Sequence, residues 1–383
     1  MTIHEIRMLV TVCVATAAAL GCLYSIVSSL LMASFFRRPL GAPAAFPAVT
    51  VIRPLHGREH ALVDNLSSFL VQDYPGPVQF LFGVHDAHDP ALEAVEAIRA
   101  RYPHADVTVV ADTRLHGPNR KISNIVNMLA HAKHAVFVFA DSDVHASPDT
   151  LRHVVATLEE PDVGLVSCLF RGQPDPGFWP RVSAAACNYH FVPSVVIGLV
   201  SKLARPCFGP MIAMRRDTLE RIGGLTQFSS HLAEDHAIGE AVRAIGLRVE
   251  IPPFIVTQAC VETTSRAFVH HELRASRTIR RITPQGHLGS VITYPFALAL
   301  IAMLLAGAAP WSLVLLGVAL LSRLHVGIQA DRALGRTLHG LAVLPLCELM
   351  LFYVFIASFR SSRVVWRGHR FSVDDSGLMT ARK

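Results

Sequence analysis

Long apolar segments near both ends of the chain constrain its fold more than any other feature of the sequence. Residues 8–36 are nearly free of charge and end at Arg37 and Arg38, and a second apolar block extends from about residue 289 to residue 359. A helix of roughly 20 apolar residues is long enough to cross a bilayer. Hydrophobic residues make up 51% of the 383 residues and charged residues only 17%, whereas soluble domains carry about 25% charged residues. This balance excludes a disordered chain and predicts a membrane protein.

The first apolar block is interpreted as a retained membrane anchor, residues 1–38. A cleaved signal peptide is the alternative, but it would have a short apolar core and a cleavage site of small residues. This block is long and stops at two arginines, which the positive-inside rule places in the cytoplasm together with the domain that follows. Residues 39–47, rich in Pro and Ala, are predicted to be a linker to that domain.

The second block, residues 286–360, is predicted to hold three more membrane segments. Four spans would leave the tail, residues 361–383, outside the cytoplasm, yet the tail is basic and basic segments favour the inside. An exported tail and a re-entrant segment are both open at this point. The expected spans are residues 291–307, 311–324 and 338–359, the last preceded by a polar loop with Arg323, Asp331, Arg332 and Arg336.

Residues 48–285 have ordinary polarity and are long enough for one α/β domain with its own core. Short β-branched and aromatic segments alternate with helical patterns, which predicts a mostly parallel sheet with helices on both faces. In such sheets, ligands bind beyond the carboxyl ends of the strands. The expected strands are residues 48–52, 78–84, 107–111, 135–140 and 163–169, and the expected helices are residues 62–71, 90–101, 122–132 and 148–158.

Cysteine and histidine spacing argues against a structural metal site. The seven cysteines form no CxxC pair and no short metal-binding spacing, and the 20 histidines show no HExxH pattern. Neither a disulfide framework nor a structural zinc site is therefore expected.

The strongest chemical signal is Asp141-Ser142-Asp143, which follows an apolar strand pattern. Two carboxylates at i and i+2, delivered to the edge of a sheet, suit a hard divalent cation such as Mg²⁺ or Mn²⁺. A turn rich in Asp is the plain structural alternative. The residues 117–121, Gly-Pro-Asn-Arg-Lys, precede a predicted helix whose free N–H groups favour an anion, although a solvated basic turn would look the same.

Two helical patterns carry further charged groups. Glu234 and Asp235 begin a predicted helix, either to match its dipole or to supply a general base, Asp235, to an acceptor hydroxyl. Arg274, Arg277 and Arg281 share one helix face, which fits contact with anionic lipid or a clamp on a diphosphate. Residues 180–206 are apolar but interrupted by polar side chains, which favours an interfacial amphipathic helix or a buried core helix.

In this order, these motifs resemble those of processive-type family 2 glycosyltransferases and, more closely, the ceramide glucosyltransferase family (family 21). The family pattern D, D, D, (Q/R)xxRW is matched by Asp89, Asp141, Asp235 and residues 274–278, where Thr278 replaces the tryptophan. Residues 51–57, 72–75 and 119–124 match as well, and the resemblance covers residues 10–360. It implies a cytoplasmic GT-A domain, with a Rossmann-like, mostly parallel sheet, between N-terminal and C-terminal transmembrane helices.

The resemblance also implies a role for each candidate residue in an inverting transfer from a UDP-sugar. The nucleotide-sugar would be held by Asp89 and the backbone near Pro54, together with Asn119, Lys121 and Asp141. Mg²⁺ or Mn²⁺ would be bound by Asp141 and Asp143. Asp235 would take the proton from the attacking hydroxyl, and Arg274 and Arg277 would stabilise the released diphosphate.

Within the family, the chain is most similar to bacterial hopanoid-biosynthesis glycosyltransferases, which are associated with moving N-acetylglucosamine onto bacteriohopanetetrol. The implied partners are a UDP-sugar donor, a lipid acceptor and the bacterial inner membrane, with no nucleic acid. Ceramide glucosyltransferase-type glycosphingolipid synthesis is one alternative. A processive polysaccharide synthase is another, although its need for a translocation channel and the missing tryptophan count against it. A non-enzymatic membrane scaffold with a decayed domain is the third.

Overall fold

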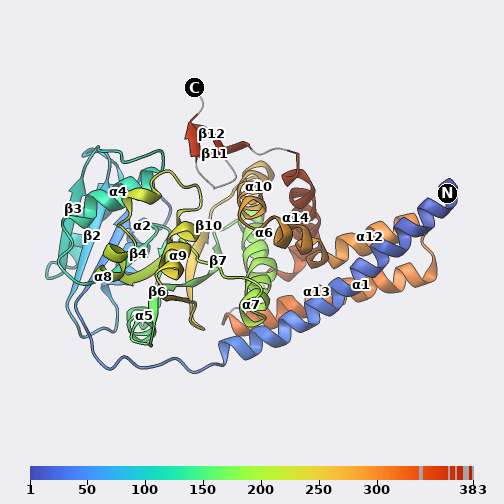
Figure 1. Cartoon of the computed structure of the whole chain (residues 1–383), viewed down its shortest axis with the longest axis horizontal. Helices are drawn as coiled ribbons and strands as arrows, with labels where there is room; N and C mark the ends of the chain where they lie inside the picture. The colour runs from blue at the N-terminus through green and yellow to red at the C-terminus, as the bar shows by residue number, and fades with distance from the viewer. Residues whose placement is uncertain (336–339, 361–362, 367–368, 374–378, 382–383) are drawn as a thin grey trace. The chain divides into compact units, whose positions relative to one another are not determined.

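The computed structural model describes residues 1–335, 340–360, 363–366, 369–373 and 379–381 (Figure 1). The chain forms two compact units, each built from separated stretches of sequence. The sheet unit contains Arg38–Phe170 and Pro206–Ala259, with strand β13 (Met379–Ala381). The helical unit contains Met1–Arg37, Arg171–Arg205 and the described residues of Cys260–Ser376.

The sheet unit is organised around a seven-stranded sheet with the order β3-β2-β1-β4-β8-β6-β9. Strands β1 to β4 are parallel to one another, β8 is antiparallel to both of its neighbours, and β9 is parallel to β6. This arrangement confirms the predicted α/β class with a mostly parallel sheet. The strands are β1 (Val49–Pro54), β2 (Val78–Val84), β3 (Asp106–Ala111), β4 (Val136–Ala140), β6 (Val163–Ser167), β8 (Met211–Arg215) and β9 (Arg248–Glu250).

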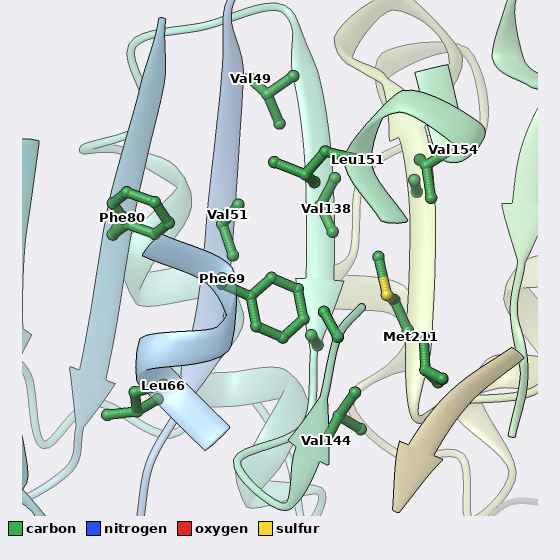
Figure 2. Packing of buried hydrophobic residues seen from close by; sticks show 14 of the residues in the cluster. Val49, Val51, Leu66, Phe69, Phe80, Val138, Val144, Leu151, Val154 and Met211 are labelled. Carbon is green, nitrogen blue, oxygen red and sulfur yellow. The ribbon is translucent and has the colours of Figure 1, made fainter. Parts of the chain in front are cut away.

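Helices cover both faces of this sheet because side chains alternate along each strand. On one face, Val51 and Val138 pack with Phe69 in a core that Figure 2 shows. On the other face, Ile52 and Phe137 are buried with side chains of α4 and α9. The helices of the unit are α2 (Leu62–Leu70), α3 (Ala91–Arg101), α4 (Arg120–Leu129), α5 (Thr150–Leu158), α8 (Arg216–Arg221), η2 (Thr226–Phe228) and α9 (Glu234–Ala244).

A short antiparallel pair extends the unit just past the end of β4. Strand β5 (Val144–His145) pairs with β10 (Ile255–Cys260), so that Gln258 lies opposite Val144. The pairing brings β10 next to the Asp141-Ser142-Asp143 turn, although more than 100 residues of chain separate the two segments.

The helical unit holds most of the apolar sequence. Among the described residues, four helices are long and apolar enough to cross a membrane: Ile3–Phe36, Phe178–Val200, Pro310–Ala333 and Leu341–Ser358. The elements are α1 (Ile3–Phe36), β7 (Leu169–Pro174), α6 (Phe178–Ala186), the π-helix η1 (Cys187–Phe191), α7 (Val192–Val200), α10 (Ser265–Ile282), α11 (Pro284–Gly289), η3 (Ser290–Thr293), α12 (Pro295–Leu305), α13 (Pro310–Ala333), η4 (Leu341–Val343), α14 (Leu344–Ser358), β11 (Arg363–Trp366) and β12 (His369–Val373).

The structure bears on three of the predictions about the membrane segments. The predicted span over residues 291–307 falls on a bent pair of helices, Pro284–Thr293 and Pro295–Leu305, with an angle of 66° between its parts, and it stays a prediction because such a pair is either a broken span or a re-entrant loop. Proline at position 295 lacks the N–H that would continue the preceding helix. The prediction of a polar loop after residue 324 was wrong as far as Ala333. Helix α13 continues to that residue, and its Arg323 and Asp331 are both buried. The stretch predicted as an interfacial amphipathic helix or a buried core helix, residues 180–206, overlaps one of the four long apolar helices, Phe178–Val200.

Small side chains let α1, α12 and α13 approach closely. Ala18, Ala299 and Ala319 are fully buried in one cluster. At Gly21, an added Cβ would lie 2.4 Å from the carbonyl oxygen of Ile292, so only glycine fits there. Small residues at helix interfaces are typical of membrane proteins, where close packing replaces the hydrophobic effect as the driving force.

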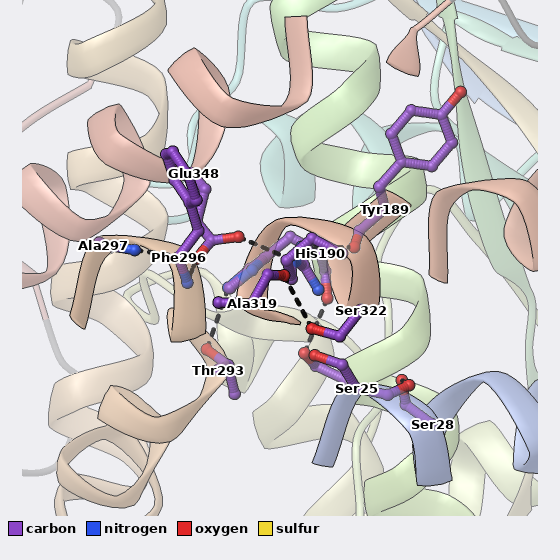
Figure 3. A network of polar contacts seen from close by, with 12 residues as sticks. Ser25, Ser28, Tyr189, His190, Thr293, Phe296, Ala297, Ala319, Ser322 and Glu348 are labelled. Atoms are coloured by element: carbon purple, nitrogen blue, oxygen red, sulfur yellow. Dashed lines mark hydrogen bonds and ion pairs between the residues drawn. The ribbon is translucent and has the colours of Figure 1, made fainter. Parts of the chain in front are cut away.

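Buried charges in the helical unit are paired (Figure 3). The Arg323 Nε donates to Glu348 Oε2 at 2.7 Å, and its Nη2 donates to the carbonyl of Tyr189 at 2.9 Å. The other Glu348 oxygen accepts from the backbone N–H of Phe296 at 2.7 Å, in the first turn of α12. The Tyr189 hydroxyl donates to Asp331 at 2.9 Å. These partners explain why α13 carries polar residues that a hydropathy pattern interprets as a loop.

We expect Arg323→Met to destabilise the protein strongly, because it leaves the Glu348 carboxylate buried without its counter-charge. Breaking a buried ion pair from one side costs about 3–5 kcal/mol. The measurement is the melting temperature of the full chain in detergent micelles. Arg332→Met, on the same helix at an exposed position, is the matched control and should change the melting temperature little. Equal melting temperatures for the two variants would contradict a structural role for the pair.

Candidate active site

Asp141 and Asp143 lie at the carboxyl end of β4, at the edge of the sheet where the sequence predicted them. The Asp141 N–H donates to the carbonyl of Pro210 at 2.9 Å, which ties the turn to the segment before β8. Gln258 Nε2 donates to Asp143 Oδ2 at 3.0 Å. The other oxygen, Asp143 Oδ1, is buried and has no hydrogen-bond partner among the described residues. Burial, with the charge of Asp141 next in size, raises the pKa of Asp143 to about 6.

Lys121 meets Asp141 from the N-terminal turn of α4. Asn119 caps this helix, since its Oδ1 accepts from the N–H of Ile122 at 3.1 Å. The Lys121 ammonium lies 2.7 Å from Asp141 Oδ1 and 3.4 Å from Glu234 Oε1. Burial alone would lower the pKa of Lys121, but the carboxylates around it outweigh burial and raise its pKa above the usual range. Lys121 is therefore the cation that balances this group of acids.

Glu234 and Asp235 form the first turn of α9 and complete the cluster. Asn119 Nδ2 donates to Glu234 Oε2 at 3.2 Å, and Asp235 Oδ1 accepts from the N–H of His236 at 2.8 Å. Burial, followed by repulsion from Glu234, raises the pKa of Asp235 to about 7. An added Cβ at Gly209 would lie 3.3 Å from Asp235 Oδ2, so the glycine leaves space beside this carboxylate. A carboxyl group with such a pKa can exchange protons near neutral pH.

The structure thus brings together five of the predicted site residues. They come from the end of β4, the start of α4 and the start of α9, and they all belong to the sheet unit. These residues are Asn119, Lys121, Asp141, Asp143 and Asp235.

Asp89 and Pro54 lie near the end of β1. Asp89 is buried, and its Oδ1 accepts from the N–H groups of Gly57 at 2.7 Å and Ala91 at 2.9 Å. His56 Nδ1 lies 3.3 Å from the other Asp89 oxygen. Asp89 therefore links the turn after β1 to the start of α3. The contacts of Asp89 and of the Pro54 backbone with a nucleoside remain predictions.

Arg274 and Arg277 lie on α10 in the helical unit, one turn apart on the same helix face. Thr264 caps α10 by accepting from the N–H of Ala267 at 3.1 Å. Partial burial, with repulsion from Arg280, lowers the pKa of Arg277, although a guanidinium remains charged at physiological pH. The predicted clamp on a diphosphate stays a prediction.

Three residues that bear on the site had no role in the sequence-based prediction. Arg53 on β1 is fully buried, and its guanidinium donates to the carbonyls of Asn65 at 2.8 Å, Asp141 at 2.5 Å and Val144 at 2.9 Å. Burial lowers the pKa of Arg53 to about 10. Its signal in the sequence was a single charge inside an apolar strand pattern. Glu234 stood in a recognised motif without a separate role, and nothing in the sequence marked Gln258.

The residues present fit a divalent cation that shares its ligands with a substrate. Among the described residues, no group of three or more His, Cys, Asp or Glu side chains could hold a metal ion by itself. Mg²⁺, however, is commonly bound through one or two carboxylates, with substrate phosphates and water completing its shell. Asp141 together with the unpartnered Oδ1 of Asp143 supplies such a donor set.

A family model described as Glycosyl transferase family 21 matches residues 13–379 of the chain. The chain is 24% identical over 245 residues to Ceramide glucosyltransferase 1 of Caenorhabditis elegans, covering 63% of this chain and 51% of that protein. It is 32% identical over 124 residues to a ceramide glucosyltransferase of Candida albicans, covering 30% and 23%. The chain thus spans about half or less of the length of these relatives.

A solved structure has a similar fold along nearly the whole chain. It is a mannosyltransferase from Pyrobaculum calidifontis in complex with GDP-Man and Mn²⁺, with a TM-score of 0.52 and 20% sequence identity. The similarity covers 91% of this chain and 99% of that chain. Together with the strand order, it confirms the predicted GT-A fold class with several candidate membrane helices near both termini.

We expect Arg53→Met to lower the melting temperature, because three backbone carbonyl oxygens each lose a charged donor at once. Each buried polar group left unsatisfied costs about 1–3 kcal/mol. Arg114→Met is the control, since Arg114 is exposed and its ion pair with Asp112 lies at the surface; its melting temperature should stay close to that of the wild type. If Arg53→Met melts like the control, Arg53 does not hold the turn at Asp141.

Proposed function

Because the chain belongs to glycosyl transferase family 21, we propose that this membrane glycosyltransferase moves a sugar from a UDP-sugar to the hydroxyl of a lipid. The proposed sugar is N-acetylglucosamine and the proposed acceptor is bacteriohopanetetrol, in the inner membrane of a bacterium. The proposed reaction inverts the anomeric centre, and the sheet unit faces the cytoplasm, where UDP-sugars are available.

The observation that carries the proposal is the environment of Asp235. This half-buried carboxylate lies beside the Lys121–Asp141 pair at the carboxyl edge of the mostly parallel sheet, where α/β proteins bind their ligands. A general base works best when its pKa is near the operating pH, and burial gives Asp235 such a pKa. We infer that Asp235 accepts the proton of the lipid hydroxyl as that oxygen attacks the anomeric carbon.

The remaining residues bind and orient the donor. Pro54 and Asp89 hold the nucleoside from the end of β1, and Asn119 fixes the first turn of α4, from which Lys121 reaches the phosphates. Mg²⁺ or Mn²⁺ bound by Asp141 and Asp143 would neutralise the charge that develops on the departing diphosphate. For Arg274 and Arg277 we propose the role that the family resemblance implies, stabilisation of the released diphosphate, for which planar, bidentate guanidinium donors are suited.

A single base is sufficient for this reaction. Hydrolysis of a glycosidic bond requires one acid to protonate the leaving oxygen and a second carboxylate to attack or activate water. A diphosphate leaves as a stabilised anion and needs no proton. One in-line displacement then gives a product of inverted configuration.

Ceramide is the second candidate acceptor, with glucose as the sugar. The relatives named above favour it, since both are named ceramide glucosyltransferases. Both acceptors present a hydroxyl at the membrane surface on an apolar body, so the candidate base serves either.

Mass spectrometry of lipid products tests the function directly. Membranes containing the protein are supplied with UDP-N-acetylglucosamine or UDP-glucose, each with bacteriohopanetetrol or ceramide. We expect N-acetylglucosaminyl-bacteriohopanetetrol with the wild type. In Asp235→Asn, which cannot accept the proton, we expect a loss of about 10²–10⁴-fold in rate with UDP-sugar binding retained.

Asp217→Asn is the control for this assay, because Asp217 lies at the start of α8, away from the cluster, where it accepts from the N–H of Thr218. Glucosylceramide as the product would assign the second candidate function. No sugar transfer to any lipid in the wild type, or full transfer in Asp235→Asn, would overturn the proposal.

The pH profile of kcat/KM tests the assignment of the base. A base acts in its deprotonated form, so activity should be lost as the pH falls through the raised pKa of Asp235, about 7. Glu234→Gln removes one of the charges that raise this pKa, and we expect the acidic limb of the profile to move to lower pH. Glu240→Gln, an exposed position on the same helix, should leave the limb in place. An unchanged limb in Glu234→Gln would argue against Asp235 as the titrating base.

A further inference from the structure

We propose that Gln258 is a positioning residue that turns the Asp143 carboxylate toward a divalent cation. The inference rests on the role that the proposed function gives to Asp141 and Asp143. It concerns a different question, namely how a carboxylate at the end of a turn is held in one orientation before a metal binds.

The backbone fixes where Gln258 lies. Strands β5 and β10 pair antiparallel, with Gln258 opposite Val144, the residue after Asp143. The N–H of Ala259 also donates to the carbonyl of Asp143 at 3.3 Å. The amide of Gln258 is therefore held beside the Asp143 side chain by the strand pairing and not by the flexibility of a loop.

The side-chain contact occupies one Asp143 oxygen with a hydrogen bond and leaves the other available to a cation. Gln258 Nε2 donates to Oδ2 at 3.0 Å, and the geometry requires the N–H₂ end of the amide there, since a carbonyl oxygen would face a carboxylate oxygen. Oδ1 remains buried and without a partner among the described residues. A buried oxygen that accepts no hydrogen bond is costly, and a metal ion satisfies it.

A neutral donor suits this position better than a charged one. A lysine or arginine in direct contact with an Asp143 oxygen would compete with a cation for it, as Lys121 does at Asp141 Oδ1. An amide orients the carboxylate and adds no positive charge to that of Arg53, whose side chain binds the backbone of the same turn. Groups that orient metal ligands in this way contribute strongly, since their removal typically costs about 10–100-fold in metal affinity.

The test measures how tightly the full-length protein in detergent binds Mn²⁺ in the presence of UDP. The electron paramagnetic resonance signal of free Mn²⁺ reports how much of the ion remains unbound. Gln258→Met keeps the length of the side chain and removes the N–H donor. We expect its affinity for Mn²⁺ to fall about 10–100-fold. In the sugar-transfer assay, the Mn²⁺ concentration needed for half-maximal rate should rise, whereas kcat at saturating Mn²⁺ should stay within a few-fold of the wild type.

Two control variants separate this inference from the proposed function. Gln227→Met loses an amide that donates only to the backbone carbonyls of Ile222 and Gly224 and to none of the carboxylates of the cluster, and it should bind Mn²⁺ like the wild type. Asp143→Asn removes the ligand itself and should bind Mn²⁺ more weakly than Gln258→Met. Gln258→Asn replaces the methionine variant if that variant does not fold. The side chain of asparagine is one methylene shorter, so its amide cannot reach Asp143 Oδ2.

The outcomes are distinct. Weaker Mn²⁺ binding in Gln258→Met or Gln258→Asn, with Gln227→Met unchanged, supports the inference even if the lipid acceptor proves to be a different one. Wild-type affinity in the Gln258 variants, with weak binding in Asp143→Asn, overturns the inference and leaves the metal site in place. Wild-type affinity in Asp143→Asn as well overturns both the inference and the metal role of the site.

Discussion

The sheet unit depends on balancing the negative charge that gathers at one edge of its sheet. Asp141, Asp143, Glu234 and Asp235 lie together there, and two like charges 4 Å apart repel by about 4 kcal/mol at an effective dielectric constant of 20. Two cations offset this repulsion: the half-buried Lys121, 2.7 Å from Asp141, and the buried Arg53, which also binds the backbone of the turn. The arrangement of the acids is thus a property of the fold itself, because the strands and helices that carry the acids also carry the cations.

The helical unit obeys the same constraint in an apolar setting. A charge that cannot reach water must meet an opposite charge or oriented dipoles. Glu348 meets both, since one oxygen faces Arg323 and the other accepts from the first N–H groups of α12. The break before Pro295 would otherwise expose those N–H groups to an apolar environment. The buried acid on α14 therefore stabilises the bend before α12, because it accepts hydrogen bonds from the N–H groups that the bend leaves without partners.

The sequence predicted the parts of the structure that local patterns encode. Alternating strand and helix patterns located the first strands and helices, and the five predicted residues that lie together were selected because each follows a strand or begins a helix. Arg53 and Gln258 were missed because their partners are distant in sequence: 88 residues separate Arg53 from Asp141 and 115 separate Gln258 from Asp143. Hydropathy also misplaced the end of α13, since it counts Arg323 and Asp331 as polar and cannot detect that each has a buried partner.

In the proposed function, the balance of charge would let the cluster accept a nucleotide-sugar without a large rearrangement. Lys121 and Asp141 pair with each other in the structure. A diphosphate with a divalent cation would offer each of them an alternative partner, the phosphate oxygens for Lys121 and the cation for Asp141. The added charges of the cation and the diphosphate would largely cancel. The Asp235 carboxylate accepts from backbone N–H groups, so the proposed base would keep its orientation while the donor binds.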